Sequence, residues 1–200
     1  MDGSFFPAPS SEPEPEPPVQ VSPPWLQHPS DEYPARLLVR EFLAQTEGTA
    51  LSVSHVDVYS TGLLIKIDWE LRRLGESATG WQLATGMGHF GFGSDPSGSE
   101  LRFGLALADG SAVTTVDRFR NRMSFDEEPS GWSLMNYGGG GGGGDREYSS
   151  SSRLWLWPLP PAGSIELVAE WKARGIGEVR MVLDGSALRD MVANVRSLWP

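Results

Sequence analysis

Hydrophobic and polar residues alternate along most of the chain beyond residue 35, as they do in β-strands that bury one face. The apolar positions of the clearest such segment, residues 63–72, are Leu63, Ile65, Ile67, Trp69 and Leu71. Between them lie mainly polar side chains such as Lys66 and Asp68. We therefore expect a strand with one face in a hydrophobic core and the other in water.

Shorter alternating segments predict further strands, separated by glycine, proline and other turn-forming residues. They cover residues 49–59, 101–107, 112–116, 132–137, 148–157, 165–171 and 179–183. The first of them changes parity between Ser54 and His55, which is what a β-bulge would leave in the sequence. Asp109 and Gly110 form a dipeptide favoured in two-residue hairpin turns. Residues 37–45 could form a short helix or a strand, and their β-branched and aromatic content favours the strand.

The C-terminal third of the chain concentrates the largest apolar side chains. Trp155, Trp157 and Trp171 lie in it, and each indole can bury on the order of 150 to 250 Å². In the strand that ends at Trp157, Leu154 and Leu156 fall on one face and two tryptophans on the other. A strand that is apolar on both faces should be central in its sheet or have a partner on one face.

Residues 186–198 are predicted to form an amphipathic C-terminal helix. Its apolar positions, at helical spacing, are Leu188, Met191, Val192, Val195 and Leu198. Asp184 and Ser186 supply capping side chains at its start, and we expect it to pack against a sheet, with partner binding as the alternative. Together, strands, turns and helix predict an all-β protein in which residues 35–200 form a single antiparallel β-sandwich of immunoglobulin-like size.

Residues 1–34 differ in composition from the rest of the chain. They contain an alternating run of proline and glutamate, further prolines and few residues that could bury apolar surface. We therefore expect a disordered or extended leader, held open by proline and by repulsion between glutamates. Trp25 and Leu26, which follow two prolines, leave a docking peptide as the alternative.

The net charge of −10 is divided unevenly along the chain. Residues 1–35 contain six acidic residues and neither lysine nor arginine, so 20 acidic residues accompany all 16 basic ones in the remainder. Such a body offers no basic footprint for nucleic acid or for an anionic membrane. No apolar run approaches the roughly 20 residues that span a bilayer, and the acidic N-terminus is unlike a signal peptide. The absence of cysteine excludes thiolate catalysis and fits the cytoplasmic location that we expect.

Two stretches rich in glycine interrupt the strands. Residues 138–144 are seven consecutive glycines, which form a flexible hairpin loop in one interpretation and closely approach a ligand or another strand in the other. Residues 75–100 show no sustained periodicity, so we expect an inserted loop there. Within it, residues 86–91 match the G-x-G-x-x-G string of dinucleotide-binding loops. The Phe-Gly-Ser-Asp-Pro that follows cannot open the helix that such a site requires, so we expect no dinucleotide cofactor.

Candidate catalytic and metal-binding residues are sparse, and nucleophile-elbow, Walker and zinc-protease motifs are absent from the sequence. The histidines are far apart in the sequence: His28, His55 and His89. Four strand carboxylates could in principle meet as an acid–base pair: Asp57, Asp68, Glu166 and Glu170. The alternation places three of these carboxylates on solvated faces. We therefore expect neither a metal site nor an enzyme.

Aromatic side chains on one face of a sheet suggest a binding surface. Trp155 and Trp157 share a face of their strand, and Tyr148 lies near its start, although a place in the core is the alternative. We select these three residues, with Gly138 and Gly144 at the ends of the glycine run, as candidate binding residues. The hypothesis is a non-enzymatic protein-interaction or structural module without a cofactor. A small-ligand or carbohydrate-binding β-sandwich is the alternative.

The glycine run is followed by the segments WLWPLPPAGSIELVAEW and GIGEVRMVLDGSALR. With them, residues 36–200 resemble a family of uncharacterised proteins from GC-rich bacteria that have a poly-glycine segment, a W-x-W-P-L-P-P-x-G motif, an E-W pair and a terminal helix. That family usually has Trp-Pro after the glutamate and a Gly-Ile-Pro turn, where this chain has Lys172 after Trp171 and Gly177 after Ile176. The resemblance implies a single recurring domain and no particular activity.

Overall fold

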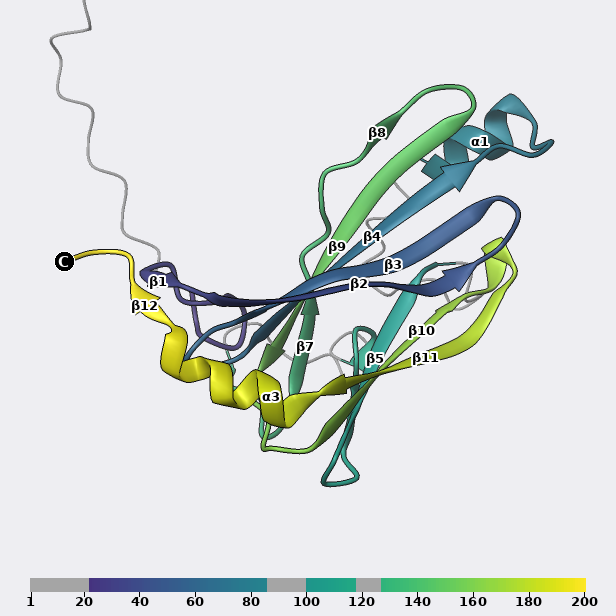
Figure 1. Ribbon diagram of the computed structural model, residues 1–200. Coiled ribbons are helices and arrows are strands. Elements are labelled where there is room, and N and C mark those ends of the chain that lie inside the picture. The colour runs from purple at the N-terminus through teal and green to yellow at the C-terminus, as the bar shows by residue number, and fades with distance from the viewer. Residues whose placement is uncertain (1–21, 86–99, 118–126) are drawn as a thin grey trace, which may run out of the picture.

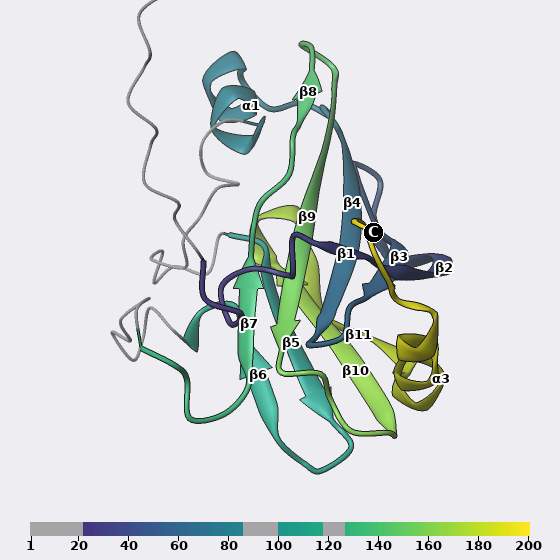
Figure 2. The ribbon, with the colours of Figure 1, turned by 90° about the vertical axis from the view of Figure 1, so that its left-hand side faces the viewer.

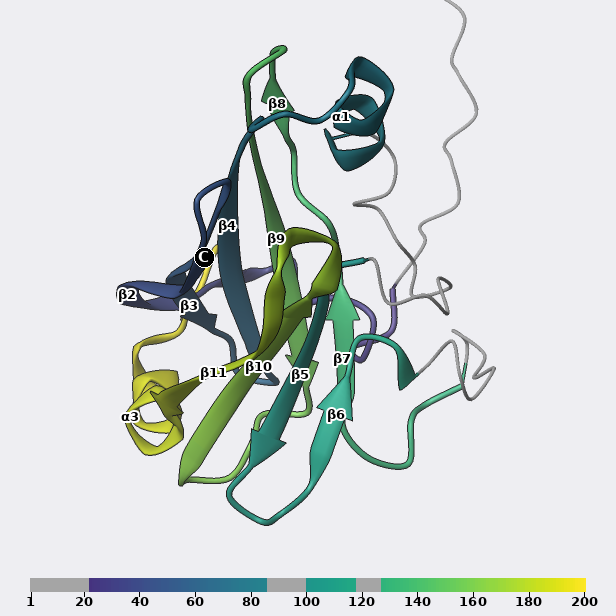
Figure 3. The same ribbon diagram turned by 90° about the vertical axis from the view of Figure 1, so that its right-hand side faces the viewer.

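Two antiparallel sheets pack face to face in the computed structural model, which describes residues 22–85, 100–117 and 127–200 (Figure 1). The strands of the larger sheet, in spatial order, are β2 (Ala35–Gln45), β3 (Thr49–Val58), β4 (Leu63–Arg72), β9 (Glu147–Trp157) and β7 (Ser133–Asn136), and β8 (Gly142–Gly143) also pairs with β9. The smaller sheet, seen in Figure 3, consists of β11 (Ile176–Asp184), β10 (Ser164–Trp171), β5 (Arg102–Leu107) and β6 (Ala112–Thr114). The predicted all-β sandwich is confirmed.

The hydrophobic core lies between the two sheets and follows the alternation seen in the sequence. Ile65 and Ile67 of β4 are fully buried, as is Leu167 of β10 in the other sheet. Trp69 and Trp171 connect the same two strands, with ring centroids 6.1 Å apart and ring planes at 80°. Burial of apolar surface at roughly 25 cal/mol per Å² is the main term that stabilises such a fold.

A β-bulge in β3 decides which side chains of this strand leave the core. The pairing of β3 with β4 shifts register between Val53 and His55, where the change of parity predicts a bulge. Val53 is buried in the core before the bulge and Val56 after it. His55 and Asp57 therefore lie on the outer face of the larger sheet.

Two other local predictions are confirmed, the second in part. Residues 37–45 belong to strand β2 rather than to a helix. Between β5 and β6 the chain makes a hairpin at the expected place, but its turn spans three residues, 108–110, rather than two, because the Leu107 N–H donates to the Ser111 carbonyl at 2.9 Å. Gly110 has a φ of 85°, which explains why glycine stands at this position.

The predicted C-terminal helix over residues 186–198 is wrong in its length. The structure has a short helix α3 (Gly185–Asp190), a 3-10 turn η3 (Met191–Asn194) and a strand β12 (Arg196–Ser197). Asp184 caps α3 as expected, since its carboxylate accepts a hydrogen bond from the Ala187 N–H at 3.0 Å. The helix ends early because β12 pairs with β1 (Glu32–Tyr33), a contact that local periodicity cannot reveal.

The leader expected over residues 1–34 also needs a correction. Residues 22–34 have a defined structure that includes β1 and crosses the outer face of the larger sheet, whereas residues 1–21 lie outside the described residues (Figure 2). Composition alone predicted disorder for residues 22–34, but this part of the leader packs against a sheet face that is itself apolar. The folded part of the chain thus includes residues well before 35.

Part of the glycine-rich stretch at residues 75–100 is helical. Helix α1 (Ala78–Thr85) buries Trp81, whose indole N–H donates to the Gly144 carbonyl at 2.8 Å. This tertiary contact holds a helix that has no amphipathic signal in the sequence. Residues 86–99, which include the G-x-G-x-x-G string and His89, lie outside the described residues. Among the residues that the structure describes, no helix is long and apolar enough to cross a bilayer.

Arg174 ties α1 to the smaller sheet. It belongs to the 3-10 turn η2 (Lys172–Arg174), where the sequence predicts the hairpin between the last two long strands. Its guanidinium carbon lies 5.9 Å from the ring centres of both Trp81 and Trp171, and Nη1 lies 2.9 Å from a carboxylate oxygen of Glu76. Hydrogen bonds from nearby backbone N–H groups, with a smaller effect of Arg174, lower the pKa of Glu76 to about 2, so this pair is ionised at neutral pH.

Candidate functional site

The outer face of the larger sheet carries a second apolar cluster, separate from the core. This aromatic cluster consists of the buried residues Tyr59, Leu64 and Trp155 and the partly buried residues Met135, Tyr137 and Trp157. Trp155 has 0% of its surface exposed although it points away from the core between the sheets. Another part of the chain must therefore cover this face.

That cover is the N-terminal segment, defined here as residues 22–31, which crosses β7 and β9 (Figure 2). The Trp155 indole N–H donates a hydrogen bond to the Pro24 carbonyl at 2.9 Å. The segment is itself turned, because the backbone N–H of Leu26 donates to the Pro23 carbonyl at 2.9 Å. The buried indole N–H is thus satisfied by a backbone carbonyl, the hydrogen-bonding group that proline residues retain.

Ring contacts extend the docking of the N-terminal segment. Trp25 meets Trp157 nearly edge-on, with ring centroids 6.0 Å apart and planes at 63°. His28 stacks on Tyr59 with centroids 4.6 Å apart and planes at 19°. Aromatic pairs in such geometries are worth about 0.5–1.5 kcal/mol beyond the area that they bury.

The structure divides the predicted aromatic platform between two faces. Trp155 and Trp157 belong to the aromatic cluster, and the first of them is covered completely. Tyr148 instead packs against the core between the sheets. Residues 148 and 155 are an odd number of positions apart in an uninterrupted strand, so they must lie on opposite faces. The expectation that Tyr148 stands beside the two tryptophans is therefore corrected.

The glycine run, residues 138–144, lies close against β9, as one of its two interpretations expects. A Cβ atom added at Gly139 would overlap the Ser151 side chain, and one added at Gly143 would overlap the Glu147 carbonyl. Gly140 and Gly142 have no heavy atom within 4 Å of an added Cβ, so alternate glycines face β9 and open space. Glycine is therefore required at every second position, where the chain approaches the strand.

The two ends of the run, predicted as binding residues, have visible structural roles. Gly138 has a φ of 40°, and its N–H donates to the Asn136 side-chain oxygen at 3.0 Å. Gly144 accepts the Trp81 indole hydrogen bond at 2.8 Å and thereby fixes α1. Gly138 and Gly144 as ligand contacts stay a prediction.

Replacing Gly139 with alanine is expected to lower the free energy of unfolding by about 1–3 kcal/mol, because overpacking would push the run away from Ser151. Gly140→Ala should leave that free energy unchanged or raise it by up to about 1 kcal/mol, since its Cβ points into open space. Urea denaturation of the two variants measures the difference. Equal stabilities would show that the run does not depend on close contact with β9.

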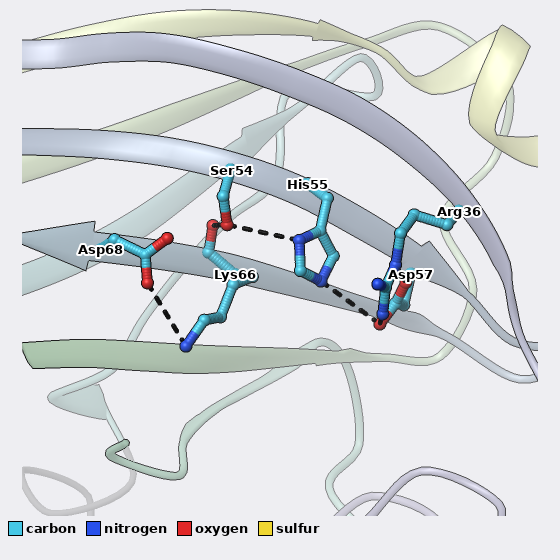
Figure 4. A network of polar contacts seen from close by, with 6 residues as sticks. All are labelled: Arg36, Ser54, His55, Asp57, Lys66 and Asp68. Atoms are coloured by element: carbon cyan, nitrogen blue, oxygen red, sulfur yellow. Dashed lines mark hydrogen bonds and ion pairs between the residues drawn. The ribbon is translucent and has the colours of Figure 1, made fainter. Parts of the chain in front are cut away.

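Beside the aromatic cluster, the outer face carries a polar network from β2, β3 and β4 (Figure 4). Arg36 donates to both carboxylate oxygens of Asp57, from Nε at 2.6 Å and from Nη2 at 2.9 Å. His55 Nε2 lies 3.5 Å from Asp57 Oδ2, and His55 Nδ1 lies 3.3 Å from Ser54 Oγ. The bulge in β3 makes this chain of contacts possible, because it places two consecutive residues on the same face.

Burial and pairing set the charges in this network. Burial lowers the pKa of His55 below its ordinary value, although the Asp57 carboxylate opposes the shift, so the imidazole is neutral at pH 7. The hydrogen bond to Asp57 raises the pKa of Arg36. Burial, reinforced by Asp57, raises the pKa of Tyr59 to about 12. At neutral pH the network therefore holds the ion pairs Arg36–Asp57 and Lys66–Asp68 beside the neutral imidazole of His55, and the neutral phenol of Tyr59 lies next to it.

A cavity of about 380 Å³ opens between the polar network, the N-terminal segment and the glycine run. The charged residues that line it are Arg36, Asp57, Lys66 and Arg153. Tyr59 and Leu64 of the aromatic cluster add apolar surface, and Gly139 and Gly140 form part of its wall. His28 and His55 both border the cavity although they are far apart in the sequence. The sequence did not predict this site because its residues come from several strands, and local sequence patterns do not show which strands pair with one another.

The contacts among Ser54, His55 and Asp57 do not make a catalytic triad. Ser54 Oγ also lies 3.4 Å from the Lys66 carbonyl, and Ser54 is not among the residues that line the cavity. Both oxygens of Asp57 are held by Arg36, which competes with His55 for the carboxylate. A nucleophile needs access to a substrate carbonyl as well as a base within reach, and Ser54 has only the second, from His55.

The four strand carboxylates do not meet as an acid–base pair. Each has a cationic partner instead: Arg36 for Asp57, Lys66 for Asp68, Arg180 for Glu166, and both Arg102 and Lys172 for Glu170. Asp68, Glu166 and Glu170 are partly exposed, in agreement with the solvated faces expected for them.

A larger hollow of about 700 Å³, about as open to solvent as the first, lies at the ends of β3 and β4 beside β8. Its charged groups are Glu47, Glu70, Arg72 and Glu147. In the described ranges of the chain, no group of three or more histidine, aspartate or glutamate residues is arranged to hold a metal ion.

No family model, curated protein or solved structure matches the chain. The resemblance to the poly-glycine family, the cytoplasmic location and the lack of an enzymatic activity accordingly stay predictions.

Proposed function

We propose that this protein is a non-enzymatic interaction module whose aromatic cluster binds proline-rich segments of polypeptide. The observation that carries the proposal is the hydrogen bond from the Trp155 indole to the Pro24 carbonyl at 2.9 Å, within a face that the N-terminal segment covers. Tryptophan and tyrosine side chains that present a ring beside a hydrogen-bonding group are the usual means of recognising proline-rich chains. The native N-terminal segment would then occupy the face in cis.

Proline suits such a face for a physical reason. Proline-rich chains already favour an extended conformation, so they lose little entropy on binding and keep their carbonyl groups available. In the N-terminal segment, Pro23 and Pro24 precede Trp25, which supplies the ring that packs on Trp157. A competing segment, from another protein or from a second copy of this chain, would need the same elements in the same order.

The experiment is a competition between the segment in cis and a labelled peptide of residues 22–31 in trans. The full chain carrying Trp25→Ala loses the ring contact with Trp157, so its aromatic cluster should become accessible. We expect the peptide to bind this variant at least tenfold more tightly than the native chain, measured by fluorescence anisotropy. The expected factor corresponds to about 1.4 kcal/mol, within the range of an aromatic pair.

Trp199→Ala is the matched control, because this indole is 69% exposed and removing it opens no face. A peptide with alanine in place of tryptophan should bind neither variant. Adding Trp155→Phe to the Trp25→Ala chain removes the indole donor but keeps a ring, and should weaken peptide binding again. If the peptide binds Trp25→Ala and Trp199→Ala chains equally, the aromatic cluster is an ordinary buried contact and the proposal fails.

The carbohydrate-binding alternative stays a prediction with weaker support. A sugar ring needs an exposed aromatic face to stack on, and Trp155 is fully covered while Trp157 is partly covered by Trp25. A small polar ligand has a better candidate site in the cavity next to the cluster.

A further inference from the structure

We propose that the cavity of about 380 Å³ on the outer face is a binding site for a small organic anion, with a carboxylate or phosphate head and an apolar body. Pockets of roughly 300–1,000 Å³ are typical of small-ligand sites. The site adjoins the proposed peptide-binding face and shares Tyr59, Leu64 and the segment residue His28 with it, but its charged groups belong to the sheet.

The main observation is a row of basic residues across three neighbouring strands. His55 of β3 pairs in register with Lys66 of β4, and Lys66 pairs in register with Arg153 of β9. Lys66 and Arg153, directly opposite each other on one face, therefore bring two positive charges to neighbouring positions. Like charges in this arrangement destabilise a sheet. An anion bound between them would remove this repulsion.

The carboxylates nearby leave part of this charge uncompensated. Asp57 is engaged by Arg36 through two hydrogen bonds, and Asp68, which does not line the cavity, lies 3.3 Å from Lys66. Within the part of the chain that the structure describes, Arg153 has no ion pair. A local excess of positive charge is unexpected in a chain with a net charge of −10.

The rest of the lining indicates what the anion carries. Tyr59 and Leu64 border the cavity but are themselves largely buried, so the apolar body that lies there while the oxygens reach Lys66 and Arg153 must be small. His28 of the N-terminal segment also borders the cavity and stacks on Tyr59. The ligand is therefore an oxyanion attached to an apolar group, and its head group is either a phosphate or a carboxylate.

The first test titrates the full chain with benzoate, phenyl phosphate and neutral benzamide by isothermal calorimetry at low ionic strength. At least one of the two anions should bind, with an affinity that falls as salt is added, and benzamide should not. The stronger of the two anions identifies the head group. If neither anion binds more tightly than benzamide, the proposal is overturned.

Charge variants then locate the site. Arg153→Gln should weaken anion binding roughly tenfold or more, because a charge-assisted hydrogen bond is lost. Arg180→Gln removes the same charge from β11 of the other sheet and should leave the affinity unchanged. Thermal unfolding of the ligand-free Arg153→Gln chain should show no loss of stability, since the substitution relieves the repulsion with Lys66. Equal losses of affinity in the two variants would contradict the site.

The glycine run offers a second matched pair. Gly140 and Gly142 both accept a Cβ without contact, but only Gly140 lines the cavity. Gly140→Asp should weaken binding of the anion several-fold by placing a carboxylate at its wall, whereas Gly142→Asp should not. If both variants fold and bind the anion as the native chain does, the ligand does not occupy this cavity.

Discussion

Replacing Ile67 with aspartate is expected to leave the protein largely unfolded at 25 °C. Ile67 is fully buried in the middle of β4, paired with Val53 of β3 on one side and Ser152 of β9 on the other. A carboxylate at this apolar position should cost more than about 4–5 kcal/mol, since it must be buried unpaired or take up a proton. Whole domains are stable by only about 5–15 kcal/mol. Far-UV circular dichroism and urea denaturation measure the loss.

The preceding residue in the chain is the matched control. Lys66 projects from the opposite face of β4, and its partly exposed ion pair with Asp68 is worth about 0–1 kcal/mol. Lys66→Ser should therefore unfold close to the native midpoint. A native midpoint for the aspartate variant as well would mean that the core does not lie on the Ile67 face of the strand.

The strands could be predicted because burial of one sheet face imposes a period of two on the sequence. Leu63, Ile65 and Ile67 show that period without interruption, and β4 has the expected bounds. Even the bulge in β3 was visible, since a single extra residue reverses the parity between Val53 and Val56. The residues that a strand buries on its core face follow from its own sequence. Such features can therefore be predicted without knowing the partner strand.

Elements held by distant contacts could not be predicted in the same way. The N-terminal segment has a composition typical of disorder, and only the tertiary position of Trp155 gives it a surface to pack on. The C-terminal helix stops at residue 190 because β12 pairs with β1, more than 150 positions earlier in the chain. In each case a long-range contact overrides the local pattern.

The candidate site was only partly visible from the sequence. The sequence showed that Trp155 and Trp157 share a face of a doubly apolar strand, which had to be central or covered. The structure shows that it is both, because β4 and β7 flank β9 and the N-terminal segment lies over it. The basic row could not be seen, because it depends on the register that sets Lys66 opposite His55 and Arg153.

Removing the Trp155 side chain is the second substitution with a large expected effect. Trp155→Ala should lower the free energy of unfolding by about 3–5 kcal/mol, because a completely buried indole is lost and the surrounding cluster cannot fill the space. The substitution also removes the hydrogen bond to Pro24 and the edge contact with Tyr59, whose ring centroid is 5.7 Å away. Urea denaturation measures the stability.

The same variant should free the N-terminal segment, because this segment packs on Trp155. Chymotrypsin should then cut after Trp25 much faster than in the native chain, under conditions in which the sandwich itself stays folded. Trp199→Ala is the control, since that indole is 69% exposed and its loss should cost clearly less stability and leave the segment in place. If the two variants were equally stable and equally resistant after Trp25, the segment would be held by something other than the indole of Trp155. The apolar outer face of β9 would then not be what holds the peptide segment. The proposed recognition of proline-rich segments would lose its physical basis.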